Sequence, residues 1–97
     1  MEFLVRIDVR LPAELPDEAR NDLAAAESAR GRELQDAGSI VRIWRVPGRH
    51  SNVGVWQAAD ASELHDLLIS LPLFRFMDID VQALATHPLE RVRPPSS

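Results

Sequence analysis

The sequence contains no cysteine and no lysine, so its eleven basic residues are all arginines. The absence of cysteine excludes disulfide bonds and thiol chemistry, and it fits a reducing compartment. The absence of lysine excludes a Schiff base and a lysine proton acceptor.

Long apolar runs and concentrated positive charge are also missing. No segment approaches the roughly 18 apolar residues of a membrane span. The N-terminal residues MEFLVRIDV carry charges within a strand pattern, unlike a signal peptide, so we expect a cytoplasmic protein. The net charge is -4 and no element gathers a basic stripe, which argues against a nucleic-acid partner. With 97 residues, 45% of them apolar, the chain is expected to form one small globular domain.

Alternating apolar and polar residues predict four strands. Residues 2–10 place Phe3, Val5, Ile7 and Val9 on one face, which is the pattern of a half-buried strand. Residues 39–46 and 52–58 predict two more strands, joined as a hairpin through the turn Pro47-Gly48. The fourth strand covers about residues 77–82.

Two helices are predicted between these strands. The first begins near Asp17, which follows Pro16 and can cap it, and runs to Gly38. The second begins at the capping-box pattern from Asp60 to Glu63 and ends at about Ser70.

The predicted order is βαββαβ. It indicates a ferredoxin-like α+β fold, in which two helices cover one face of a four-stranded antiparallel sheet. Residues 1–86 form this domain, and the proline-rich, polar residues 87–97 form a C-terminal arm.

The second face of the sheet is expected to carry Trp44 and Trp56. Helices can cover only one side, so both indoles would be exposed in a monomer and would mark a subunit interface. The alternative is that loops and the arm cover them. We expect a homo-oligomer.

Glu27 is the leading acid–base candidate. It falls within the apolar stripe of the first helix, which consists of Ala19, Leu23, Ala26, Leu34 and Ala37. A carboxylate on that face is costly unless it is paired or faces a cavity. One interpretation is an ion pair with Arg30, which lies one turn away. The other is a partly desolvated proton shuttle with a raised pKa.

The three histidines give weaker signals. His50 lies in the hairpin loop, where active-site groups are commonly displayed. His65 on the second helix fits a surface or hydrogen-bonded histidine, and His87 precedes Pro88 in the tail. No pair has metal-ligand spacing, so no metal is expected. The apolar connection at residues 71–77 is more typical of core than of a cofactor pocket.

Two segments resemble the muconolactone isomerase family. They are IWRVPGRHSNVGVW and LHDLLISLPLFRFMDIDVQALATHP, and the likeness spans nearly the whole chain. The resemblance implies a ferredoxin-like subunit in a ring-like homodecamer, with the arm reaching a neighbour and active sites at subunit interfaces. It implies no cofactor and no metal, and it places residues 71–77 between subunit layers and around the pocket.

The resemblance also implies a reaction. The family converts muconolactone, a small lactone, to 3-oxoadipate enol-lactone in catechol degradation, by moving a proton from the γ to the α carbon. Glu27 matches the family glutamate that shuttles the proton. Arg45 and Asn52 match residues that would bind a carboxylate or carbonyl oxygen, and His65 matches a histidine of structural or binding role.

The chain also departs from the family pattern. Ala24 and Ser28 stand where members usually have lysines, and His50 stands where members often have tyrosine. Arg30 or Arg49 would then supply the charge that faces the ligand. Two alternatives stay open, a chloromuconolactone dehalogenase and a non-catalytic ferredoxin-like protein that binds a small acid.

Overall fold

The structure is a computed structural model, and it describes residues 1–90 of the chain. Its elements follow the predicted order, with one 3-10 turn added before the last strand. They are β1 (Glu2–Val9), α1 (Asp17–Asp36), β2 (Ile40–Arg45), β3 (Ser51–Gln57), α2 (Ala61–Ile69), η1 (Phe74–Phe76) and β4 (Met77–Leu84). No helix in the described part is both long and apolar enough to cross a membrane.

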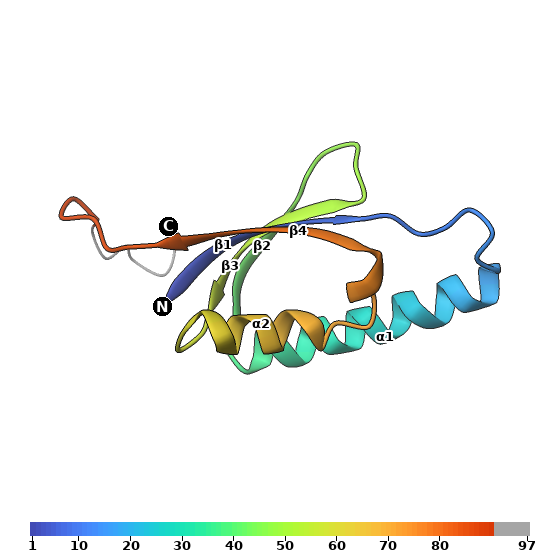
Figure 1. Ribbon diagram of the computed structural model, residues 1–97, viewed down its shortest axis with the longest axis horizontal. Coiled ribbons are helices and arrows are strands. Elements are labelled where there is room, and N and C mark those ends of the chain that lie inside the picture. Colours follow the sequence, from blue (N-terminus) through green and yellow to red (C-terminus); the bar gives the residue numbers. More distant parts are fainter. Residues whose placement is uncertain (91–97) are drawn as a thin grey trace.

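The four strands form one antiparallel sheet in the order β2-β3-β1-β4. Both helices lie on the same side of it (Figure 1). β1 is central, and its Val5 pairs with Gly54 of β3 and with Val81 of β4. The predicted ferredoxin-like fold is therefore confirmed, and β2 and β4 form its edges.

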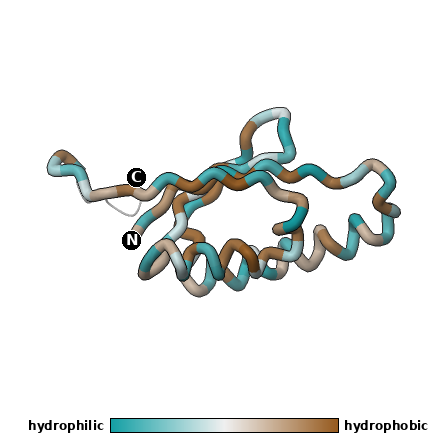
Figure 2. The backbone as a smooth tube through the Cα atoms, viewed as in Figure 1, coloured by the Kyte–Doolittle hydropathy of each residue, from teal (hydrophilic) through white to brown (hydrophobic). Residues whose placement is uncertain are grey.

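The core lies between the sheet and the helices. Because side chains alternate along a strand, Phe3, Val5 and Ile7 of β1 all point to this side and are buried. The other members of the core cluster are Leu34, Ile40, Trp56, Ala58, Leu64, Leu68 and Leu71. Figure 2 shows hydrophobic and hydrophilic residues mixed along both helices. Leu34 is the one buried residue of α1, so that helix is anchored to the core near its C-terminal end.

A β-bulge changes which side chains of β2 face the helices. Ile40 pairs with Trp56, but Arg42 pairs with Val55, so one residue of β2 is extra. Ile43 therefore faces the same side as Ile40, and Trp44 faces the opposite side. The prediction that Trp44 and Trp56 share the open face is wrong. Trp56 is only 1% exposed in the core, whereas Trp44 is 45% exposed.

The helix ends agree with the sequence in part. The Asp60 side chain accepts a hydrogen bond from the Glu63 amide at 2.8 Å, so the predicted N-cap of α2 is confirmed. The predicted cap of α1 is wrong, because Pro16 occupies the cap position and Asp17 is already helical. At the other end of α1, Gly38 has a φ of 81°, and the amide of Ser39 donates to the carbonyl of Leu34 at 2.8 Å. This Schellman ending stops the helix close to the predicted residue.

Candidate active site

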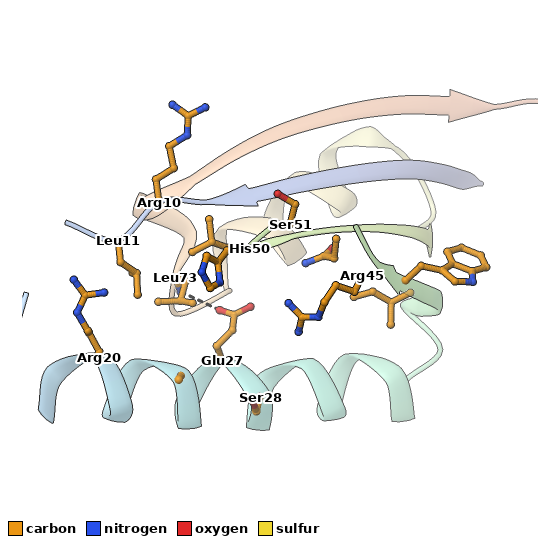
Figure 3. A pocket seen from close by; sticks show the side chains of 14 residues that line it. Arg10, Leu11, Arg20, Glu27, Ser28, Arg45, His50, Ser51 and Leu73 are labelled. Atoms are coloured by element: carbon orange, nitrogen blue, oxygen red, sulfur yellow. Dashed lines mark hydrogen bonds between the residues drawn. The ribbon is translucent and has the colours of Figure 1, made fainter. Parts of the chain in front are cut away.

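A cleft of about 840 Å³ separates the middle of α1 from the β2–β3 hairpin (Figure 3). Its lining comes from α1, the end of β1, the hairpin and the connection after α2. The residues are Val9, Arg10, Leu11, Arg20, Ala24, Glu27, Ser28, Ile43, Trp44, Arg45, His50, Ser51, Asn52 and Leu73. The cleft exists because the buried residue of α1, Leu34, lies near its C-terminal end, so the rest of the helix is not packed into the core. Along the cleft α1 presents the small side chains of Ala24 and Ser28.

Glu27 points from α1 into this cleft (Figure 3). Its Oε1 accepts a hydrogen bond from the backbone amide of Leu73 at 3.0 Å, across 46 residues of sequence. Burial raises the pKa of the Glu27 carboxyl, and the bond from Leu73 opposes part of that rise. Such a carboxylate is a stronger base than an exposed one, and its acid form is easier to reach.

The alternative of an ion pair between Glu27 and Arg30 is wrong. Arg30 donates to Glu33 at 3.1 Å and to the hydroxyl of Ser70 at 3.0 Å. Within residues 1–90, Glu27 has no ion-pair partner. Its place on the apolar face of α1 is therefore explained by the cleft and by the amide of Leu73.

Arg45 and Asn52 reach the cleft together because of strand pairing. They are opposite each other in the β2–β3 register, on the same side of the sheet as the helices. The Oδ1 atom of Asn52 is buried and has no hydrogen-bond partner among the described residues. Oδ1 can only accept a hydrogen bond, so the side-chain NH2 group of Asn52 is the part that can donate to a ligand oxygen. His50 also lines the cleft (Figure 3).

Three residues predicted to face the ligand lie outside the cleft lining. Arg30 is tied to Glu33 and Ser70, and His65 is exposed on α2; neither lines the cleft in the described part of the chain. Arg49 also lies outside this lining. The other predicted contacts, Arg45, Asn52 and His50, are brought together with Glu27.

Two further cationic residues line the cleft, and neither was predicted from the sequence. Arg10 follows β1 and forms an exposed ion pair with Asp78 at 3.4 Å, and its guanidinium points away from the cleft in Figure 3. Arg20 lies on α1, seven residues before Glu27. At about 100° per residue the two fall roughly 20° apart on the helix, so this spacing was a usable signal.

The cleft thus combines one carboxylate of raised pKa with several hydrogen-bond donors and positive charges. This arrangement suits proton transfer within a small anionic substrate, because the base removes the proton and the donors hold the negative charge that develops. In residues 1–90 no three acidic or histidine side chains are grouped as metal ligands.

Comparison with known proteins agrees with this chemistry. The family model described as muconolactone delta-isomerase matches residues 1–90. The muconolactone delta-isomerase of Acinetobacter baylyi is 41% identical over 88 residues, which is 91% of this chain and 92% of that protein. The enzyme of that name from Rhodococcus opacus is 40% identical over 85 residues, 88% of this chain and 91% of that one.

A solved structure gives the same result in three dimensions. The crystal structure of a muconolactone isomerase superposes with a TM-score of 0.89 at 34% identity, covering 97% of this chain and 98% of that chain. Sequence and structure therefore agree over almost the full length, and the resemblance seen in the sequence is confirmed. The chain belongs to the muconolactone delta-isomerase family.

Proposed function

We propose that this protein is a cofactor-independent isomerase that converts muconolactone to 3-oxoadipate enol-lactone. The observation that carries the proposal is the carboxylate of Glu27, half-buried and directed into a cleft that also holds Arg45 and Asn52. Family membership supplies the substrate class, and the geometry supplies a base and charge-stabilising groups in one place.

The proton transfer needs only one acid–base group. Ionised Glu27 removes the proton from the γ carbon, which bears the carboxymethyl arm. The electrons of that C–H bond form a new double bond to the β carbon, and those of the old double bond move toward the carbonyl as a dienolate. Glu27, now protonated, returns the proton to the α carbon. The sum is a shifted C=C bond, and the enzyme ends in its starting state.

Burial of Glu27 assists both halves of this cycle. A carboxylate that gives up solvation is a stronger base, and the raised pKa makes its protonated form an accessible intermediate. The guanidinium of Arg45, the side-chain NH2 of Asn52 and a ring N–H of His50 are the donors for the developing oxyanion, since all three residues line the cleft opposite Glu27. Charge stabilisation of this type contributes most in a site that excludes water.

An ultraviolet assay of the purified protein tests the proposal. Muconolactone and its 5-chloro analogue are supplied in parallel, and the products are identified by proton NMR. Isomerisation of muconolactone is expected. Chloride release from the analogue without isomerisation of muconolactone would instead identify a dehalogenase. Binding without turnover of either compound would favour a non-catalytic small-acid-binding protein.

We further propose that the protein acts as a homo-oligomer, a decamer, in the cytoplasm. Both edge strands of the sheet present exposed apolar side chains, Val41 and Trp44 on β2 and Val81 and Leu84 on β4. Apolar groups gathered on sheet edges are typical of surfaces that other subunits cover. In this proposal residues 87–97 form an arm that crosses to a neighbour; residues 91–97 lie outside the described part of the chain.

A further inference from the structure

Arg20 shares one face of α1 with Glu27. The two residues are seven positions apart, which is almost two full turns, and both line the cleft. Ala24 lies between them and has no side chain beyond its Cβ atom, so it leaves the space between the two functional groups open. In Figure 3 Arg20 and Arg45 lie on opposite sides of the Glu27 carboxylate.

The guanidinium of Arg20 is held in place by backbone carbonyls. Its Nε donates to the oxygen of Leu15 at 3.0 Å, and its Nη2 donates to the oxygen of Pro12. These bonds tie the segment between β1 and α1 to the helix. They also fix the planar group in advance, so less side-chain freedom is lost when a ligand binds. The guanidinium retains N–H groups beyond those two.

The charge of Arg20 is not neutralised by the protein in residues 1–90. Arg10 is paired with Asp78, and Arg30 is paired with Glu33, but no carboxylate lies within ion-pair distance of Arg20. The side chain is nevertheless partly buried. A partly buried cation without a counterion, at the edge of a cleft, is suited to an anionic ligand group.

The substrate has two electron-rich ends that suit two cations. Its carboxymethyl arm is attached to the γ carbon, which loses the proton. Its lactone carbonyl carbon is the other ring neighbour of the ring oxygen, so the two groups lie on opposite sides of that oxygen. Arg45 is paired across the hairpin with Asn52, which gives two adjacent groups for the carbonyl oxygen. Arg20 lies on the other side of Glu27 from Arg45, and Arg10 on that side is paired with Asp78 and points away from the cleft. An arginine fork matches the two oxygens of a carboxylate.

We propose that Arg20 binds the carboxylate arm of the lactone and thereby selects acidic over neutral lactones. The inference rests on the proposed function for the identity of the substrate class. Arg20 takes no part in proton transfer; it orients the ring so that the γ carbon lies over Glu27.

Calorimetry with non-reacting ligands tests this independently of turnover. The ligands are the saturated analogue of muconolactone, which cannot isomerise, and its methyl ester, in which the arm is neutral. For Arg20→Gln the Kd of the acid is expected to rise about 10- to 100-fold, the usual loss for a charge-assisted contact. The Kd of the ester should stay within about twofold, and Arg20→Lys should recover part of the loss. Arg32→Gln is the matched control, an exposed arginine of α1 outside the cleft lining.

Several outcomes would overturn the inference. Equal weakening of acid and ester would mean that Arg20 acts only by holding residues 11–15. Unchanged Kd values in Arg20→Gln would also reject it, and so would a wild type that does not bind the acid. The same holds if Arg45→Gln loses the preference for the acid while Arg20→Gln keeps it. Melting temperatures verify that each variant is folded. A wild type that binds the acid through Arg20 but does not isomerise muconolactone would refute the proposed function and leave this assignment standing.

Discussion

Replacing Glu27 by glutamine separates the catalytic role of this side chain from its structural one. The change keeps the volume and the helix propensity but removes the base. Turnover of muconolactone is expected to fall about 10²- to 10⁴-fold, the usual contribution of general acid–base catalysis. The amide oxygen of glutamine can still accept the hydrogen bond from Leu73 that Glu27 accepts at 3.0 Å.

The stability of this variant has a predictable sign. Burial raises the pKa of Glu27 above its unfolded value, so the folded state favours the protonated, neutral form. The ionised carboxylate therefore lowers stability, and this cost is present once the pH is above the raised pKa. Glutamine is neutral at every pH, so the melting temperature at neutral pH should be equal to or higher than that of the wild type.

Glu27→Ala gives the complementary result. It removes the acceptor and leaves the amide of Leu73, a buried residue, without its partner. The expected loss is about 1–3 kcal/mol, and in a domain of this size each kcal/mol lowers Tm by about 4 to 8 °C. Circular dichroism melts and the ultraviolet assay are run on both variants. Glu33→Gln, on the exposed side of the same helix, is the control and should keep full turnover. A folded Glu27→Gln protein that turns over muconolactone at the wild-type rate would remove this residue from the mechanism.

Three further predictions follow from the same structure. The pKa read from the acid limb of the kcat/KM profile should be higher than that of an ordinary glutamate, because only ionised Glu27 is a base. The residual rate of Glu27→Gln should not change with pH over the same limb, which checks the assignment. Gly54→Ala should cost about 1–3 kcal/mol, since a Cβ atom there would lie 2.8 Å from the backbone oxygen of Arg42; an unchanged Tm would contradict this. Light scattering should show a homo-oligomer at micromolar concentration and a smaller particle for Trp44→Glu on exposed β2, whereas a monomeric wild type would refute the proposed assembly.

Local sequence patterns were sufficient to predict most of the elements. The alternation of Phe3, Val5 and Ile7 marks β1 because side chains alternate in any strand, whatever its neighbours. The Asp60 cap bonds the amide three residues later, so it too is a local feature. Glu27 was identified for a related reason: its position within an apolar helical stripe can be counted along the chain.

The faces of β2 could be known only from the tertiary structure. A bulge depends on how a strand pairs with its partner, and here one extra residue after Ile40 reverses every side chain beyond it. Trp44 and Trp56 were therefore predicted on one face but lie on opposite faces. The same register places Arg45 opposite Asn52, a pairing that no local spacing shows.

The surroundings of Glu27 were likewise decided by long-range packing. Glu27 accepts a hydrogen bond from the amide of Leu73, 46 residues away in the sequence. Arg30, its expected ion-pair partner, donates hydrogen bonds to Glu33 and Ser70 instead. A helical wheel shows which residues share a face, but it does not show what that face meets. The sequence by itself determined that Glu27 is a carboxylate on the apolar side of a helix. Only the tertiary structure decided that this side opens on a cleft, because the cleft is the space left where α1 is anchored to the core at one end alone.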